Sequence, residues 1–115
     1  MKSLSVQIQP GLSPGIDMAA VSAAFAQIAA ESDLVRRHAF DSGDDDGAYY
    51  NFTFGTERAR ELWQAIWQSV YLAPAFQPHM AAASMAMCSS EAGWQNYAQL
   101  YHWDPTVPTS SAAAL

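Results

Sequence analysis

The sequence has a single cysteine, Cys88, among 115 residues. An intrachain disulfide is therefore excluded, and so are the paired-cysteine motifs of zinc and redox sites. A chain without disulfides is suited to a reducing compartment. The first sixteen residues contain no continuous apolar stretch, because Gln7, Gln9 and two proline-glycine breaks interrupt it, and no segment reaches the length of a membrane span. We expect a cytoplasmic protein.

Basic residues are also scarce. Five Lys and Arg stand against eleven Asp and Glu, which gives a formal net charge of −6. The basic residues are scattered as Lys2, the pair Arg36 and Arg37, then Arg58 and Arg60. Binding to nucleic acid or to an anionic membrane is not expected, because both require clustered cations.

Signatures of catalysis and of cofactor binding are absent as well. The chain contains no nucleophile elbow, P-loop or dinucleotide-binding glycine motif. His38, His79 and His102 stand at no metal-ligand spacing from one another or from a cysteine or carboxylate. Cys88 follows Met-Ala-Met on a predicted buried strand, where a thiol is inert. We therefore predict no catalytic residue, no metal and no cofactor.

Hydrophobic periodicity predicts an α/β (α+β) fold. Leu4, Val6 and Ile8 alternate with polar residues, as in a strand with one buried face. Apolar residues at helical spacing predict helices near 17–37 and 56–73. Further strands are predicted near 48–54, 81–88 and 94–103, although the composition of 81–88 also suits a helix. The order β-α-β-α-β-β indicates a two-layer sandwich of about four strands with two helices on one face.

One domain is expected over residues 1–105, because 115 residues, half of them apolar, suffice for a single core. Residues 106–115 are predicted to form an irregular tail. The last four residues of this tail resemble a remnant of an expression vector.

An acidic loop is predicted ahead of the second strand. Asp41, Asp44, Asp45 and Asp46 place four carboxylates within six positions, immediately before an aromatic run at 49–54. Such a loop would steer a basic protein surface toward the sheet edge beside it. The segment partly resembles a calcium-binding loop. Calcium is not expected, because a serine occupies the first ligand position and a threonine the position of the bidentate glutamate.

The predicted last strand is rich in aromatic residues. Strand alternation places Tyr97, Tyr101 and Trp103 on one face and Leu100 and His102 on the other. Trp and Tyr dominate the energetic hot spots of protein interfaces, so a foreign partner or a second copy is expected to cover this strand. The predicted partner-binding residues are Asp41, Asp44, Asp45, Asp46, Trp94, Tyr97, Tyr101, His102 and Trp103.

A resemblance to a known family is carried by the run Ser90-Glu-Ala-Gly-Trp-Gln-Asn-Tyr-Ala-Gln-Leu-Tyr-His-Trp-Asp-Pro105. This run, in a small acidic chain, resembles the small cytoplasmic immunity proteins that bacteria encode beside antibacterial toxins. The resemblance covers about a seventh of the chain as a pattern. It implies a protein without chemistry of its own that binds and occludes a cognate toxin, and the acidic loop predicts that the toxin surface is basic.

Two other functions remain open on the sequence. The first is a homodimeric small-ligand-binding protein or enzyme in which two aromatic faces enclose a pocket and His102 or His38 acts as the acid or base. The second is a structural module that forms dimers. An inhibitor would capture one heterologous partner and turn over nothing, which distinguishes it from both.

Overall fold

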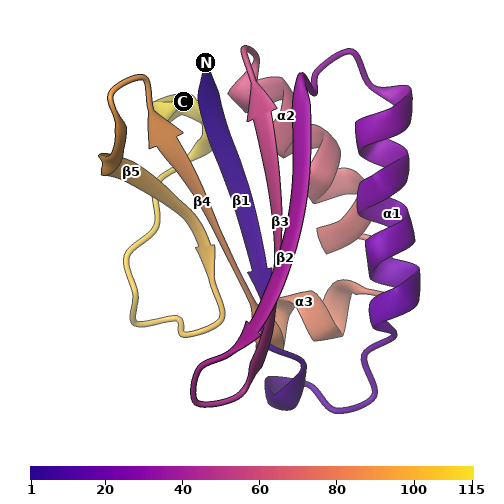
Figure 1. Ribbon diagram of the computed structural model, residues 1–115. Helices are drawn as coiled ribbons and strands as arrows, with labels where there is room; N and C mark the ends of the chain where they lie inside the picture. Colours follow the sequence, from indigo (N-terminus) through magenta and orange to yellow (C-terminus); the bar gives the residue numbers. More distant parts are fainter.

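The chain folds into one antiparallel sheet with helices packed against one of its faces (Figure 1). The computed structural model describes residues 1–115. The strands are β1 (Lys2–Ile8), β2 (Arg37–Asp44), β3 (Ala48–Thr56), β4 (Ser84–Ser90) and β5 (Gly93–His102). The helices are α1 (Met18–Glu31), α2 (Ala59–Ile66) and α3 (Gln77–Ala83), with shorter helical turns η1 (Pro10–Leu12), η2 (Trp67–Tyr71) and η3 (Ala112–Ala114).

The sheet has the strand order β2-β3-β1-β4-β5. With β1 between β3 and β4, the sequence β1-α1-β2-β3-α2-β4 forms a split β-α-β arrangement, and β5 is added beside β4. The predicted two-layer α/β sandwich is confirmed, with five strands where about four were predicted.

The additional strand is β2, in a segment predicted as the end of a helix near 17–37 and an acidic loop. Helix α1 ends at Glu31, and the chain becomes extended at Ser32 (φ −101°, ψ 131°). The prediction of a helix as far as residue 37 was therefore wrong. Apart from Gly43, every residue of β2 is exposed. A strand without a buried face is under no pressure to alternate apolar and polar residues, so periodicity does not reveal it.

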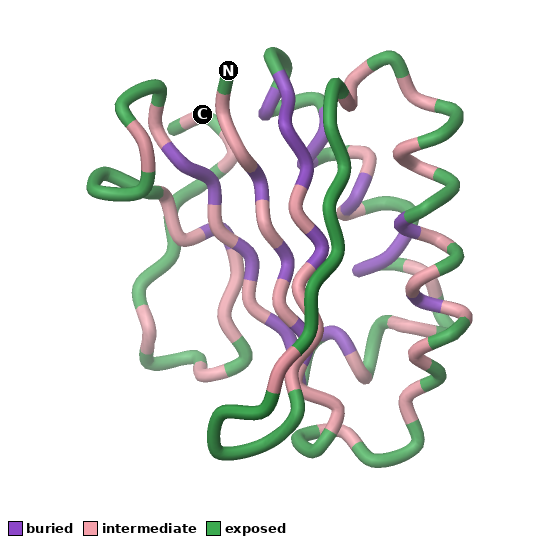
Figure 2. The backbone as a smooth tube through the Cα atoms, viewed as in Figure 1, coloured by how far each residue is buried: buried purple, intermediate pink, exposed green.

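The core lies between the helices and one face of the sheet. Leu4, Val6 and Ile8 are fully buried, as their alternation predicts. Figure 2 shows the same alternation of buried and less buried residues along the central strands. Phe25 of α1 is also fully buried and stacks on Phe52 of β3 with ring centroids 4.5 Å apart. Helix α2 contributes Leu62, Trp63 and Ile66.

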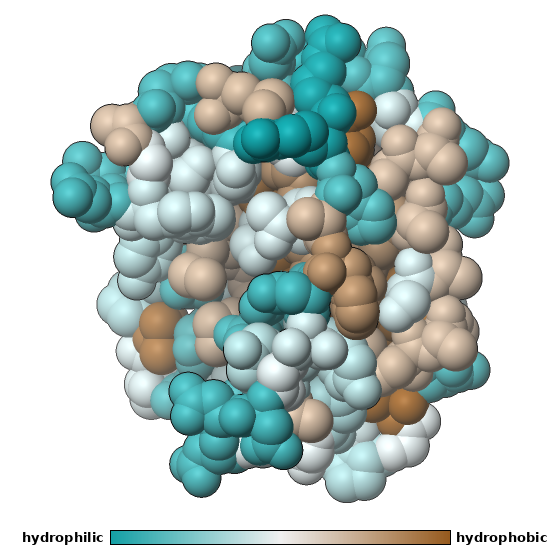
Figure 3. Space-filling view, in the orientation of Figure 1, coloured by the Kyte–Doolittle hydropathy of each residue, from teal (hydrophilic) through white to brown (hydrophobic).

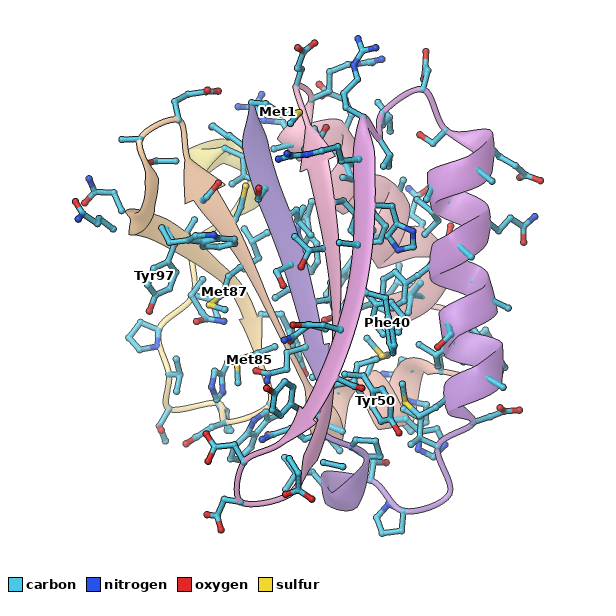
Figure 4. All side chains as sticks on the ribbon, in the orientation of Figure 1. Met1, Phe40, Tyr50, Met85, Met87 and Tyr97 are labelled. Atoms are coloured by element: carbon cyan, nitrogen blue, oxygen red, sulfur yellow. The ribbon has the colours of Figure 1, made fainter.

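No helix covers the opposite face of the sheet, which we call the open face (Figure 1). Small polar side chains occupy its centre, where Ser5 Oγ lies 3.2 Å from Thr53 Oγ1. Met85 and Met87 of β4 and Tyr97 of β5 form its apolar part (Figure 4). The open face is thus only partly apolar.

The polypeptide between the second helix and β4 differs from the prediction of one helix followed by one strand. Helix α2 continues into the π-helical turn η2, and α3 then leads directly into β4. The helix α3 ends at Ala83, so the prediction of a strand over 81–88 was wrong for its first three residues. Ser84 ends the helix, because its hydroxyl donates to the carbonyl oxygen of Met80 at 2.7 Å and its backbone is extended.

No helix of the chain is long and apolar enough to cross a lipid bilayer.

Tyr71, at the end of η2, is a buried phenol with one hydrogen-bond partner. Its hydroxyl lies 2.8 Å from Ser84 Oγ, and the residue is 3% exposed. Burial disfavours the charged phenolate and raises the pKa of Tyr71 far above its usual value of 10.0. The hydrogen bond to Ser84 acts in the opposite direction and is the smaller effect.

We expect the free energy of unfolding to fall steeply above pH 10. The raised pKa of Tyr71 means that unfolded chains ionise from about pH 10 while the folded protein keeps its proton, so the stability present below that pH is lost as pH rises. Tyr71 alone should contribute a slope of about 1.4 kcal/mol per pH unit. Burial also raises the pKa of Tyr101 and of Cys88, which makes the total slope larger.

Urea unfolding at several values between about pH 9 and about pH 11.5 measures this slope. The Tyr71→Phe variant is the control, because it removes the ionisable hydroxyl and leaves the ring in place. Its slope should be shallower by the contribution of Tyr71. Identical slopes in the two proteins would contradict the effect of burial on this group.

The C-terminal segment 106–115, which was predicted to be an irregular tail, lies against the domain. The backbone N–H of Ser110 donates to the carbonyl oxygen of Gln99 at 2.7 Å. At the end of the chain, Lys2 Nζ donates to the carbonyl oxygen of Leu115 at 3.0 Å, and the Leu115 side chain packs against the core. These contacts hold the segment beside β5 and the start of β1.

Candidate functional site

The predicted acidic loop forms the end of β2 and the tip of the β2–β3 hairpin. An Asp-Gly pair suits this turn, because Asp46 and Gly47 both have positive φ, 58° and 128°. Asp44 Oδ1 accepts a hydrogen bond from the backbone N–H of Gly47 at 3.3 Å. Asp41, Asp45 and Asp46 are exposed to solvent. Four carboxylates are therefore presented on a regular hairpin.

Charge is distributed unevenly between the two ends of the strands. We call one of them the hairpin end: it holds the last residues of β1, β2 and β5 and the first residues of β3 and β4. Figure 3 shows hydrophilic residues at both the top and the bottom of the view, and those at the bottom lie where Figure 1 has the β2–β3 turn. The acidic residues at the hairpin end are Asp17, Asp41, Asp44, Asp45, Asp46 and Asp104, and no Lys or Arg lies there. The formal net charge of −6 is thus concentrated at this end.

The opposite end holds all five Lys and Arg together with the other five acidic residues. Many of these charges are paired. The N-terminal amine lies 2.9 Å from Glu91, and Arg36 lies 3.4 Å from Glu57. A third pair joins Arg58 to Glu61 at 3.8 Å. This end therefore carries little net charge, and an approaching cation is attracted to the hairpin end.

A hollow of about 230 Å³ lies beside the tip of the hairpin. One wall is formed by Asp46, Gly47 and Ala48, and the other by Gln9, Gly11 and Leu12, which follow β1. Leu12 is 44% exposed there. An apolar side chain and a carboxylate in one hollow match a lysine or arginine side chain, whose stem is apolar and whose head is cationic.

The sheet places the acidic hairpin and the aromatic strand at opposite edges. β2 and β5 are separated by the three strands β3, β1 and β4. The sequence predicted that the acidic residues would steer a basic surface toward the sheet edge beside them and that the last strand would contact it. The acidic residues lie at the β2–β3 edge, and of the aromatic last strand only its final residues share the hairpin end.

A β-bulge separates aromatic residues that the sequence placed on one face. Tyr101 pairs with Ala86 and Gln99 pairs with Met87, so that Leu100 is the extra residue between them. Tyr101 therefore faces the helices, whereas Tyr97 lies on the open face (Figure 4). The prediction of a shared face was wrong, because one extra residue moves the following side chains to the other side of the sheet.

Each predicted aromatic contact residue has a different environment. Trp94 is 45% and Tyr97 51% exposed, and both lie on the part of β5 away from the hairpin end. Tyr101 is half-buried, and its hydroxyl donates to the carbonyl oxygen of Ala81 at 2.9 Å. Trp103 is 37% exposed and directly follows β5, at the hairpin end.

His102 and Asp104 belong to the turn that contains Trp103. His102 Nδ1 accepts a hydrogen bond from the backbone N–H of Asp104 at 2.9 Å. The backbone N–H and the hydroxyl of Thr106 both donate to Asp104 Oδ1, and these bonds hold the pKa of Asp104 below its usual value. The turn thus presents Trp103 next in sequence to a carboxylate that stays charged.

An aromatic cluster under β5 was missed as a candidate site. Trp67 stacks on Tyr71 with ring centroids 5.0 Å apart, and Trp63 lies 5.7 Å from Trp67. Hollows of about 300 Å³ and 240 Å³ flank Trp67. Neutral side chains, among them Gln64, line the larger one. The four-residue spacing of Trp63, Trp67 and Tyr71 is visible in the sequence, but it indicates equally well a helix face buried in the core.

The remaining nucleophilic and ligand-type side chains have local partners. His79 Nδ1 lies 2.7 Å from Ser13 Oγ, and His38 stacks on Phe54 with ring centroids 4.9 Å apart. Cys88 is buried, and burial raises the pKa of its thiol. No group of three or more His, Cys, Asp or Glu residues is placed to hold a metal ion.

No protein-family model, no curated protein and no solved structure matches the chain.

Proposed function

We propose that this protein is a non-catalytic inhibitor that binds one protein partner through its hairpin end. The observation that carries the proposal is the concentration of the net charge of −6 at that end, without a single Lys or Arg. Such a field attracts a basic surface from a distance and orients it before contact. A partner with a cationic active site, which would be occluded by the hairpin, fits this field best.

The hollow beside Asp46 supplies the short-range part of the proposed recognition. A lysine or arginine of the partner would pack its stem against Leu12 and direct its head to the Asp46 carboxylate. Trp103 lies at the same end of the sheet and is 37% exposed, so it is the aromatic residue that we assign to the interface. Trp94 and Tyr97 lie away from the hairpin end, and Tyr101 contributes to packing beneath β5.

The resemblance of Ser90–Pro105 to immunity proteins supports the same function. Such a protein would act in the cytoplasm, without cofactor or metal, by covering the active surface of a cognate antibacterial toxin. The structural counterpart of this resemblance is β5 with the turn that follows it. The identity of the toxin is then set by the shape and charge of the hairpin end.

A second candidate function is binding of a small neutral ligand. The larger hollow beside Trp67, of about 300 Å³, favours it, because aromatic walls with a few polar groups are typical of ligand sites. Such a site would be formed within one chain, and it contains neither His102 nor His38. A Trp67→Ala variant would lose the ligand and leave capture of a protein partner unchanged.

Affinity purification of the tagged protein from its native host tests the proposed function. We expect one stoichiometric protein with a basic surface, captured at about 0.1 M salt and released well below about 1 M, because added salt shortens the range of the attraction. The same chain with Asp44, Asp45 and Asp46 changed to Asn should capture much less of it. Capture that is equal for both chains, or insensitive to salt, would contradict recognition by the hairpin end.

A further inference from the structure

The two edges of the sheet are protected to different degrees. β5 pairs irregularly with β4, and the backbone of Ser110 is hydrogen-bonded to Gln99 of β5. β2 pairs with β3 through eight consecutive residue pairs without an irregularity, and nothing pairs with its outer side. Edge strands are usually protected by charged side chains, especially lysine, or by proline, bulges or short length. β2 is eight residues long and contains no lysine, proline or bulge, and its charged residues are Arg37, Asp41 and Asp44.

An exposed aromatic residue lies in the middle of this unpaired edge. Phe40 is 52% exposed, although its ring lies 5.2 Å from the buried ring of Phe52. Tyr50 continues the aromatic row, 6.0 Å from Phe40 (Figure 4). The core therefore reaches the edge of the sheet and remains uncovered there. Figure 2 shows β2 exposed along almost its whole length.

The charges along β2 are ordered in a way that matches a second copy of the same strand. Arg36, whose exposed side chain also lies 3.4 Å from Glu57, directly precedes β2. Arg37 is the first residue of β2, and Asp41 and Asp44 stand in its second half. Two such strands running antiparallel bring the basic beginning of each beside the acidic half of the other. A strand with this polarity complements itself, as a two-fold symmetric interface requires.

We propose that two copies of this chain associate through their β2 edges in an antiparallel arrangement, with Phe40 on the two-fold axis. Each copy adds its strand to the sheet of the other, so that the outward backbone groups of β2 become paired. The Phe40 rings cover each other and extend the two cores into one layer. This association shares Asp41 and Asp44 with the proposed inhibitor surface, whereas Asp45 and Asp46 lie beyond the paired strands. Its test is the oligomeric state of the isolated chain and does not require the inhibitor's partner.

The register follows from the pleat of the sheet and from charge. In an antiparallel pair, two directly opposed residues have their side chains on the same face of the sheet. For two symmetric copies of β2, this condition leaves two registers with the longest overlap of the strands. One has Phe40 opposite Phe40, and the other has Asp41 opposite Asp41. The second places like carboxylates in direct opposition, which is unfavourable. The first places Arg36 opposite Asp44 of the second copy and Arg37 diagonal to Asp41 of the second copy.

Sedimentation velocity of the purified full chain, from about 1 μM to about 500 μM, tests the proposal. We expect a monomer–dimer equilibrium with a dissociation constant in the micromolar range, because a single pair of strands is a small interface. Phe40→Asp should raise that constant at least about tenfold, since it places two carboxylates on the axis. A chain that stays monomeric over the whole range would overturn the proposal.

A charge-reversal cycle tests the register and does not depend on Phe40. Arg36→Asp and Asp44→Arg should each weaken dimerisation several-fold, and the double variant should restore it, because each copy then supplies both new partners. Met87→Asp is the control on the open face and should leave dimerisation unchanged. A dimer that is dissociated by Met87→Asp and unaffected by Phe40→Asp would move the interface to the open face and overturn the proposal, as would failure of the double variant to recover.

Discussion

Replacing Phe25 by alanine is expected to lower the free energy of unfolding by about 3–5 kcal/mol. Phe25 is fully buried at the contact of α1 with the sheet. Its ring stacks on Phe52 at 4.5 Å and lies 5.8 Å from Phe54. The substitution removes buried apolar area and two aromatic contacts, and it leaves a cavity that α1 can close only by moving toward β3. Such a loss is a large part of the stability of a domain of this size.

Urea unfolding of the purified variants measures this loss. Phe40→Ala is the matched control. Phe40 lies on the helix-covered face of the sheet and, like Phe25, contacts Phe52, but its side chain is 52% exposed. Its loss should be about 1 kcal/mol or less when measured at low protein concentration, where the chain is monomeric. Equal losses for the two variants would show that α1 does not close the core as described.

The periodic segments of the sequence predicted those parts of the fold whose two sides differ in burial. β1 is the clearest case, because Leu4, Val6 and Ile8 face the core while Ser5 and Gln7 lie on the open face. β2 could not be found in this way, since it is exposed on both sides. β2 is held in the sheet by backbone pairing with β3. Backbone pairing between two segments does not require a periodic pattern of apolar residues in β2, so the sequence does not reveal this strand.

The sequence was sufficient to predict which acidic residues belong to the candidate site. It was not sufficient to predict where they lie relative to the aromatic residues of the last strand. The acidic run was evident, and its position at a tight turn follows from the Asp46-Gly47 pair. The separation of this turn from the aromatic strand follows from the strand order, which no local pattern specifies. The bulge at Leu100 likewise depends on the pairing with β4, so the opposite facing of Tyr97 and Tyr101 could not be derived from alternation.

The concentration of charge at one end is a property of the topology. Asp17 and Asp104 are far from the hairpin in sequence, but β1 and β5 both end where the hairpin turns. All five basic residues lie beside the other ends of these strands. The sequence shows only that the net charge is −6. The fold places this charge at one end of the molecule, so a basic partner is attracted to that end.

Changing Asp44, Asp45 and Asp46 together to Asn is expected to slow association with the co-purified basic partner by about tenfold or more at low salt. These residues supply half of the six carboxylates at the hairpin end, and all three are exposed to solvent. The rate of dissociation should change less, because long-range attraction acts mainly before contact. Trp103→Ala should show the reverse, a faster dissociation with little change in association.

The matched control removes three negative charges from the other end of the molecule, by changing Glu31 and Glu61 to Gln and Asp33 to Asn. Both triple variants have the same net charge, so a difference between them reports where the charge lies. Stopped-flow association should show the control close to the unchanged protein at about 0.01 M salt, and the hairpin variant far slower. At about 1 M salt, where the screening length is about 3 Å, all three proteins should associate at similar rates. If the two triple variants were slowed equally, net charge alone would drive association, and the hairpin end would have no part in orienting the partner.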